Sequence, residues 1–160
     1  MSLRIGNGFD VHSLVEGSSI ILCGITIPHN KTLVGHSDAD VAMHALTDSI
    51  FGALCEGDIG QHFPPSSVKW KDADSSIFLK KAIAVMRKRK YEICNIDLTI
   101  ICETPKISDY SIVMRTNIAT HCNIDFNDVS IKGTTSEKLG FTGRDEGIAT
   151  FASVLLKSYE

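Results

Sequence analysis

Two short stretches near the N-terminus carry side chains that could bind a metal ion. Asp10 and His12 stand two residues apart, so a strand would point both to the same face. A second run, from His36 to His44, offers further imidazole and carboxylate groups. Two nitrogen ligands and one oxygen ligand suit zinc and leave a fourth position open, as in catalytic zinc sites. The alternative for an Asp-x-His pair is a solvated strand face.

The second run leads into a predicted helix. Apolar residues recur at helical spacing over residues 38–54, and the N-cap is expected at Ser37 or Asp38. On the polar face, Asp40, His44 and Asp48 are four residues apart. The two carboxylates are therefore expected to hydrogen-bond the second ring nitrogen of His44 as an outer shell. A solvated polar stripe is the alternative.

The composition predicts one globular domain over residues 1–160 with a hydrophobic core, because 43% of the residues are hydrophobic and 22% are charged. A net charge of −3 gives no electrostatic reason to expect nucleic acid as a partner. Five cysteines without a CxxC pair indicate neither a disulfide framework nor a thiolate zinc cage, and favour a reducing compartment.

The N-terminus and the apolar runs bear on localisation. Residues 1–4 are too few and too polar for a signal peptide, and no 18 apolar residues run together, so no membrane association is expected. We expect a protein of the bacterial cytoplasm, or an organelle protein whose transit peptide lies outside this sequence.

The order of the expected elements indicates an α+β fold. Strands are predicted over residues 4–12, 19–27, 93–102 and 129–133, and helices over 38–54, 73–90, 111–121 and 147–158, with a loop over 55–70. This order predicts a mixed four-stranded sheet with helices packed on one face. The third strand is apolar on both faces toward its end, so both of its faces must be covered.

The run from Thr134 to Arg144 is a second chemical feature. Its hydroxyls, its carboxylate and its pliable glycines could hold phosphate oxygens and a hard cation together. Glu137 near phosphates would be repulsive unless Mg²⁺ or a similar ion lay between them. The alternative is a capping box, Thr134-x-x-Glu137, that merely begins a helical turn. Arg144 could grip a phosphate, or could pair with an acidic neighbour, Asp145 or Glu146.

Five ordered motifs together resemble the 2-C-methyl-D-erythritol 2,4-cyclodiphosphate synthase family of the non-mevalonate isoprenoid pathway. They span essentially the whole chain: Gly8-Phe9-Asp10-Val11-His12, the run from His36 to Asp48, Gly57-Asp58-Ile59-Gly60-x-x-Phe63-Pro64, Pro105-Lys106, and the run from Thr134 to Ala149. Five motifs at family-like spacing are far more specific than any one of them.

The resemblance implies a metal-dependent lyase. The enzyme would convert 4-diphosphocytidyl-2-C-methyl-D-erythritol 2-phosphate to the 2,4-cyclodiphosphate and release CMP. Asp10, His12 and His44 match the zinc ligands, one zinc per site, and Glu137 matches the ligand of Mg²⁺ or Mn²⁺. His36 and Thr135 match residues that act on the phosphates. The family also implies a homotrimer with sheets packed around the threefold axis and active sites at the subunit interfaces.

The resemblance also assigns the substrate contacts. The phosphate, erythritol and cytidine portions are expected to touch Ser37, Asp58, Ile59, Gly60, Phe63, Cys102, Pro105, Lys106, Ile107, Ser108, Gly133, Thr134, Phe141 and Arg144. A cavity near the threefold axis, suited to an isoprenoid diphosphate, matches Phe9, Phe141 and Arg144.

The chain departs from the family pattern at a few positions. Pro65-Ser66-Ser67 stands where the family often has an Asp after Phe-Pro, Gly133 replaces a common Ala, and Asn7 replaces a frequent His. Two other functions share parts of the pattern. A zinc-dependent phosphohydrolase would use the same ligands with water as nucleophile. A trimeric ligand-binding protein would bind isoprenoids without turnover.

Overall fold

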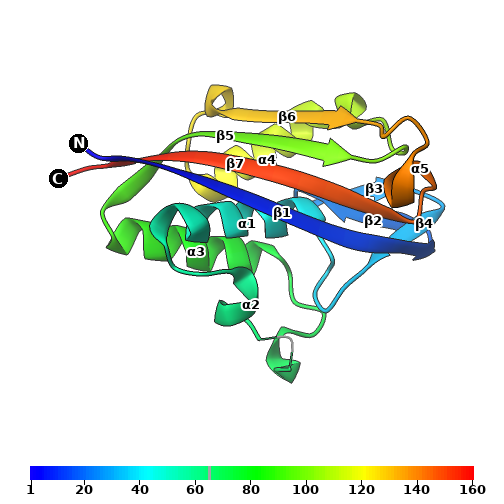
Figure 1. Ribbon diagram of the computed structural model, residues 1–160, viewed down its shortest axis with the longest axis horizontal. Coiled ribbons are helices and arrows are strands. Elements are labelled where there is room, and N and C mark those ends of the chain that lie inside the picture. Colours follow the sequence, from blue (N-terminus) through cyan, green and yellow to red (C-terminus); the bar gives the residue numbers. More distant parts are fainter. Residues whose placement is uncertain (65) are drawn as a thin grey trace.

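A mixed five-stranded sheet forms one layer of the computed structural model, which describes residues 1–64 and 66–160 (Figure 1). The strand order is β4-β1-β7-β5-β6, and only β5 and β6 run parallel. The strands are β1 (Leu3–Glu16), β4 (Lys31–Val34), β5 (Tyr91–Ile101), β6 (Val129–Thr134) and β7 (Gly147–Ser158). A separate hairpin is made by β2 (Ser19–Leu22) and β3 (Ile25–Pro28).

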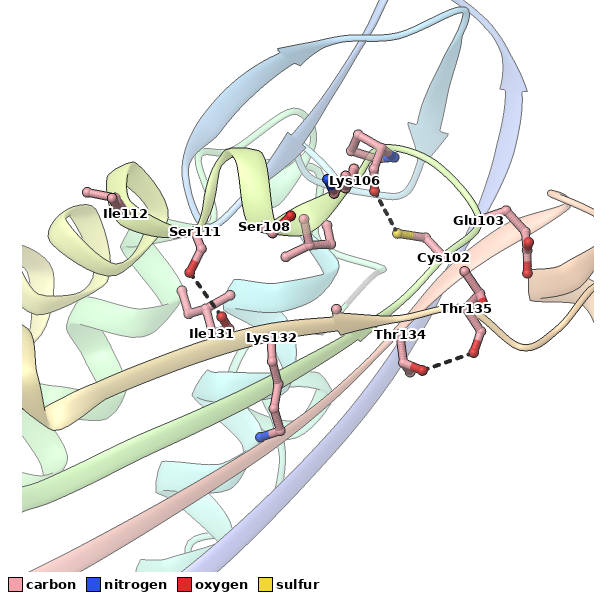
Figure 2. A pocket seen from close by; sticks show the side chains of 13 residues that line it. Cys102, Glu103, Lys106, Ser108, Ser111, Ile112, Ile131, Lys132, Thr134 and Thr135 are labelled. Carbon is pink, nitrogen blue, oxygen red and sulfur yellow. Dashed lines mark hydrogen bonds between the residues drawn. The ribbon is translucent and has the colours of Figure 1, made fainter.

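Three longer helices lie on one side of this sheet (Figure 1): α1 (Val41–Leu54), α3 (Ser76–Lys88) and α4 (Ser111–Cys122). Short helical turns complete the chain: α2 (Ile59–His62), η1 (Val68–Trp70), η2 (Ile107–Asp109), η3 (Phe126–Asp128) and α5 (Gly140–Gly143). Helix α4 is tied to β6 by the Ser111 hydroxyl, which donates to the carbonyl of Ile131 at 3.0 Å (Figure 2). Within the described residues, no helix is both long and apolar enough to cross a membrane.

Residues 147–158 form the central strand β7, so the helix predicted for this stretch is wrong. The side chains follow a period of two, and alternate residues from Ile148 to Leu156 are buried. Because β7 has neighbours on both edges and apolar residues on both faces, its sequence lacks the clean alternation of a half-exposed strand. A continuous apolar run of this kind does not distinguish a helix from a buried strand.

The predicted strand over residues 19–27 is a hairpin and lies outside the main sheet. Its turn is made by Cys23 and Gly24, whose φ angles are +53° and +73°. With β4 and β7 added, the main sheet has five strands rather than the four predicted, whereas its mixed character and the single helix-covered face agree with the prediction. Pro65, one of the departures from the family pattern, lies outside the described residues.

Helix α1 begins later than predicted, because its N-cap is Asp40 rather than Ser37 or Asp38. The Asp40 carboxylate accepts the backbone N–H groups of Ala42 and Met43, and also those of Cys23 and Gly24 in the β2–β3 turn. Asp40 is fully buried, so it does not belong to a solvated stripe. Burial raises its pKa to about 6 in spite of these hydrogen bonds.

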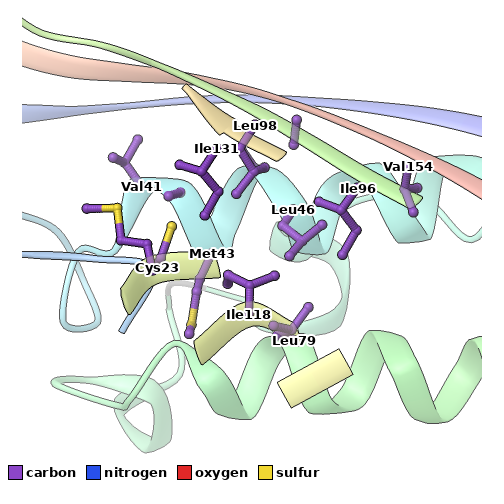
Figure 3. Close-up of a cluster of buried hydrophobic side chains, with 14 of the residues drawn as sticks. Cys23, Val41, Met43, Leu46, Leu79, Ile96, Leu98, Ile118, Ile131 and Val154 are labelled. Atoms are coloured by element: carbon purple, nitrogen blue, oxygen red, sulfur yellow. The ribbon is translucent and has the colours of Figure 1, made fainter. Parts of the chain in front are cut away.

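The core lies between the sheet and the three helices (Figure 3). On β5, Ile96, Leu98 and Ile100 face the helices and are fully buried. They pack in one cluster with Leu46 of α1 and Ile118 of α4. The opposite face of the sheet is left uncovered by the described residues and exposes Leu3, Ile5, Phe9, Val11 and Phe151.

Helix α1 packs unusually close to strand β1 because two glycines of the strand have no side chain. A Cβ atom on Gly6 would lie 1.8 Å from the carbonyl oxygen of Ser49, and one on Gly8 would lie 1.9 Å from that of Ala45. Both oxygens belong to the helix backbone, which cannot turn aside as a flexible side chain would. The two glycines therefore set the separation between β1 and α1.

We expect Gly8→Ala to destabilise the fold, because the helix must move away from the strand. Overpacking of this kind costs about 1–3 kcal/mol of unfolding free energy. Gly52→Ala is the matched control, since a Cβ there meets its nearest neighbour at 3.6 Å and should stabilise the helix by up to about 1 kcal/mol. Urea titrations followed by circular dichroism measure both effects. Equal stability of the two variants would contradict the packing argument.

Candidate metal site and adjoining cavities

Three potential ligands converge where strand β1 meets helix α1. Asp10 and His12 project from β1, and His44 projects from the first turns of α1. One ligand atom from each residue lies within 4.8 Å of the others. The Asp10 Oδ2 atom is 3.0 Å from His12 Nε2 and 3.1 Å from His44 Nδ1, and the two imidazole nitrogens are 3.0 Å apart. The triad predicted from the sequence is therefore assembled in the fold.

Hydrogen bonds on the far side of each ring fix which nitrogen faces the triad. His12 Nδ1 lies 2.9 Å from the carbonyl oxygen of Val34, so it carries the proton and leaves Nε2 free to bind a cation. Burial would raise the pKa of Asp10, but hydrogen bonds from His12 and His44 outweigh it and hold the pKa well below its usual range. Burial would lower the pKa of His12, but the hydrogen bond to Asp10, the charge of that carboxylate and the hydrogen bond to Val34 together outweigh it and raise that pKa.

The donor set fits a zinc ion, with one carboxylate oxygen and two imidazole nitrogens. The side chains of Asp10, His12 and His44 are only 28%, 15% and 12% exposed, so a bound ion would be partly shielded from water. Thr150 is paired with Asp10 across β1 and β7 and shares its face of the sheet. The Thr150 hydroxyl is buried and has no hydrogen-bond partner among the described residues, so a polar group beside Asp10 would satisfy it.

The prediction that Asp40 and Asp48 hydrogen-bond the second ring nitrogen of His44 is wrong. Asp40 caps α1, and Asp48 accepts the N–H of Ile59 at 2.7 Å. His44 Nε2 instead meets two hydroxyls, those of Ser37 at 3.0 Å and Ser75 at 2.8 Å. Ser75 was not anticipated from the sequence, because its position before α3 is typical of an ordinary N-cap.

A small cavity of about 180 Å³ adjoins the triad. Five predicted site residues line it with two of the ligands: His36, Ser37, Ile59, Gly60 and Phe63, together with His12 and His44. Phe63, Trp70 and Phe78 form an aromatic wall, with ring centroids 4.6 Å apart for Phe63 and Phe78. Asp58 is exposed beside the cavity and caps α2, where it accepts the N–H of Gln61. The cavity is thus lined by apolar side chains and by two of the candidate metal ligands.

A larger cavity of about 820 Å³ lies at the ends of β5 and β6 (Figure 2). It is lined by residues predicted to bind a nucleotide: Cys102, Pro105, Lys106, Ile107, Ser108, Gly133, Thr134 and Thr135. A Cβ atom on Gly133 would lie 2.6 Å from the Ile107 side chain, so this glycine keeps the cavity open. Among the described residues, none lines both this cavity and the smaller one beside the triad.

Glu137 lies in the exposed loop between β6 and α5. It accepts a hydrogen bond from the Thr135 hydroxyl at 3.1 Å. The capping-box interpretation is wrong, because no helix starts here and α5 begins only at Gly140. Glu137 and Lys138 both have left-handed backbones, with φ angles of +53° and +62°. Each such non-glycine residue costs of the order of 1–2 kcal/mol, so neighbouring groups must stabilise this turn.

Glu103, at the end of β5, supplies that stabilisation and was not anticipated from the sequence. Its Oε1 atom accepts the backbone N–H groups of Ser136 at 3.2 Å and Lys138 at 3.4 Å. These bonds flank the left-handed Glu137 and tie its loop to the wall of the larger cavity. The contact joins residues more than 30 positions apart, so no local pattern indicates it.

The residues predicted to form a cavity near a threefold axis lie on the uncovered side of the fold or close to its edge. The Phe9 ring packs on Phe151, with centroids 4.6 Å apart and about half of each side chain exposed. Phe141 is 40% exposed. Arg144 pairs with Glu146 through two hydrogen bonds of 2.9 and 3.0 Å. Of the two acidic neighbours named as possible partners, Asp145 and Glu146, the structure selects Glu146.

Fold and site together define an α+β protein with a three-ligand Asp-His-His centre beside a small cavity, and a larger, separate cavity at the ends of β5 and β6. A sequence model of the YgbB family matches residues 3–157. The chain therefore belongs to the YgbB family, in agreement with the resemblance found in its motifs.

Named relatives agree with this assignment. The 2-C-methyl-D-erythritol 2,4-cyclodiphosphate synthase of Roseobacter denitrificans is 55% identical over 156 residues, which cover 98% of each chain. The bifunctional enzyme IspD/IspF of Rhodobacter capsulatus is 54% identical over 156 residues, or 98% of this chain and 41% of that protein. The chain thus spans about two fifths of the length of the bifunctional relatives that it matches.

A solved structure shows the same fold with a ligand named. The IspF (Plasmodium falciparum) CDP complex has a TM-score of 0.88 and 38% identity to this chain, and the match covers 99% of this chain and 98% of that one.

We expect Glu103→Ala to loosen the Glu137 loop. Loss of the shared acceptor should speed hydrogen exchange at the amides of Ser136 and Lys138 by about tenfold, since a net hydrogen bond contributes roughly 1 kcal/mol. Glu92→Ala is the control, because Glu92 lies on the same strand β5 but pairs only with the surface residue Lys157. Exchange monitored by NMR distinguishes the two, and unchanged protection in the Glu103 variant would refute the bracing role.

Proposed function

We propose that the chain is a metal-dependent 2-C-methyl-D-erythritol 2,4-cyclodiphosphate synthase of isoprenoid precursor biosynthesis. It would convert 4-diphosphocytidyl-2-C-methyl-D-erythritol 2-phosphate to the cyclic diphosphate and release CMP. The observation that carries the proposal is the Asp10-His12-His44 triad, in a chain 55% identical to a synthase of that name over nearly the full length of both.

The reaction is an intramolecular phosphoryl transfer. An oxygen of the 2-phosphate forms a bond to the β-phosphorus, and the bond from that phosphorus to the oxygen bridging to the α-phosphate breaks, so CMP leaves with the bridging oxygen. The nucleophile is already ionised near neutral pH, so no general base is needed. This agrees with a site rich in ligands and hydroxyls.

Charge is the main obstacle, because one anionic phosphate must approach another. Zn²⁺ held by Asp10, His12 and His44, and Mg²⁺ or Mn²⁺ held by Glu137, would neutralise phosphate charge and hold the reacting groups in line. The exposed carboxylate of Glu137 and the partly buried triad offer suitable donors for a harder and a softer ion respectively.

The cavities suit the two ends of the substrate. The aromatic wall around Phe63 would pack on the erythritol methyl group, with Asp58, Ile59 and Gly60 beside its hydroxyls. His36, Ser37 and Thr135 would contact the phosphates. The larger cavity around Lys106 and Gly133 would enclose the cytidine, and the bound CDP named for the Plasmodium falciparum protein supports a cytidine ligand.

The uncovered apolar face supports a homotrimer. Leu3, Ile5, Phe9 and Phe151 are between 51% and 71% exposed on one side of the sheet, which is unfavourable in water. Packing three such faces around a threefold axis would bury them, with Phe9, Phe141 and Arg144 left to line an isoprenoid cavity at the axis. Because the two cavities of one chain share no lining residue, each active site would combine the triad of one subunit with the nucleotide cavity of its neighbour.

We expect turnover to require the triad. Protein supplied with the cytidine-diphospho substrate, Zn²⁺ and Mg²⁺ should yield CMP and a cyclic product, detected by phosphorus NMR. His44→Ala and His12→Ala should lower the rate by at least about a thousandfold and release zinc on dialysis, while His121→Ala, on the outer part of α4, should do neither. A linear bisphosphate instead of the cyclic product would indicate hydrolysis and refute the proposal.

We also expect two inactive variants to complement each other. Gly133→Val would crowd Ile107 in the larger cavity and should abolish CDP binding, whereas His44→Ala removes a metal ligand. After equal amounts are unfolded and refolded together, about a quarter of the sites in a head-to-tail ring should combine two intact halves. A mixture that stays inactive despite proven subunit exchange would rule out shared sites.

A further inference from the structure

We propose that Ser75, held by Asp38, is a positioning residue that fixes the tautomer and the orientation of His44 for metal binding. The inference rests on the proposed metal-dependent function. It concerns a chain of hydrogen bonds from Asp38 through Ser75 to His44, which joins the start of α1 to the start of α3 and which no sequence motif predicted.

The first link is the ring of His44. Its Nδ1 atom faces the triad, 3.1 Å from Asp10 Oδ2 and 3.0 Å from His12 Nε2. A neutral imidazole that binds a cation through Nδ1 must carry its proton on Nε2. That proton needs an acceptor, and the nearest oxygen to Nε2 is the hydroxyl of Ser75 at 2.8 Å.

The second link makes Ser75 an acceptor rather than a donor. Its hydroxyl proton is directed to Asp38 Oδ1 by a short hydrogen bond, and its backbone N–H donates to Asp38 Oδ2 at 3.0 Å. A hydroxyl that donates to a carboxylate becomes a better acceptor through its remaining lone pairs. Ser75 is fully buried, so water does not compete for His44.

Ser75 is the N-cap residue of α3, yet its side chain makes no capping hydrogen bond to that helix. Serine at this position usually accepts the N–H of the second or third helical residue. Here the hydroxyl turns toward Asp38 and His44 instead, and forgoes a capping interaction that is worth about 1 kcal/mol in other helices. Local helix stability therefore does not explain the side-chain direction.

Ser37 is the other hydroxyl near His44 Nε2, at 3.0 Å, and the two serines differ in what they can do. Ser37 lines the small cavity, whereas Ser75 does not. Under the proposed function Ser37 turns toward a substrate phosphate, and His44 then keeps Ser75 as its acceptor. The two serines thus have different roles: Ser37 contacts the substrate, and Ser75 orients His44.

The test measures metal affinity and does not depend on turnover. Ser75→Ala leaves His44 Nε2 only the Ser37 hydroxyl, which lacks the hydrogen bond to Asp38 that makes Ser75 a strong acceptor. Zinc affinity should therefore fall by about 10- to 100-fold, the usual effect of removing such an outer partner. Ser75→Thr keeps the hydroxyl and should restore most of the affinity. Ser49→Ala is the matched control, since Ser49 is an equally buried serine that donates only to the Leu46 carbonyl. Competition with a chromophoric chelator gives the affinities.

The visible spectrum of the Co²⁺-loaded protein is the second measurement, because it reports the ligand field directly. It should shift in Ser75→Ala and stay unchanged in Ser49→Ala. Equal zinc affinity and identical Co²⁺ spectra for these two variants would overturn the proposal. Should Ser75→Ala fail to fold, the zinc affinity of Asp38→Asn is measured in its place. A wild-type affinity in that variant would likewise overturn the proposed role of Ser75. If the unmodified protein binds no divalent metal, the proposed function fails instead.

Discussion

The distance between strand β1 and helix α1 controls the candidate metal centre, because two ligands belong to the strand and the third to the helix. Gly6 and Gly8 allow the strand to touch the helix backbone at Ser49 and Ala45. Ala45 is the residue next to His44, so the contact at Gly8 also fixes where the third ligand stands relative to Asp10. A wider spacing would keep every residue of the triad and still separate its ligand atoms. Backbone packing in the core is thus a condition for the chemistry at the edge of the core.

Some of this could be predicted from the sequence. Strand periodicity places Asp10 and His12 on one face, and the family resemblance adds His44 as the third ligand; the fold brings all three together. The predictions failed where local pattern carries no information. Strand β7 has neighbours on both edges and apolar residues on both faces, so its sequence resembles a buried helix. Asp40 was expected to hydrogen-bond His44, with a solvated stripe as the alternative, but its carboxylate fastens α1 to a turn 16 residues away.

The outer partners of the site were harder to predict than the ligands. The two carboxylates expected beside His44, Asp40 and Asp48, are bound elsewhere. Asp38 is linked to the ring instead, through the hydroxyl of Ser75. Glu103 similarly braces a loop 33 residues ahead of it. These contacts depend on how separate segments dock, and one sequence does not contain that information in any local spacing. Asp10 and His12 are two residues apart in the sequence and so form a visible pattern, whereas Ser75, which orients His44, lies more than 30 residues away from it.

The place of β7 at the centre of the sheet has a consequence for how the chain folds during its synthesis. β7 joins the β4–β1 half of the sheet to the β5–β6 half, and its pairing with β1 connects residues as distant as Leu3 and Lys157. Until residues 147–158 leave the ribosome, β1 has an open edge where its partner should be. Such long-range pairing is slow to form, and unpaired strand edges promote aggregation. The nascent chain must therefore wait for β7 before it can close its sheet, and its unpaired strand edges are open to other chains during that interval.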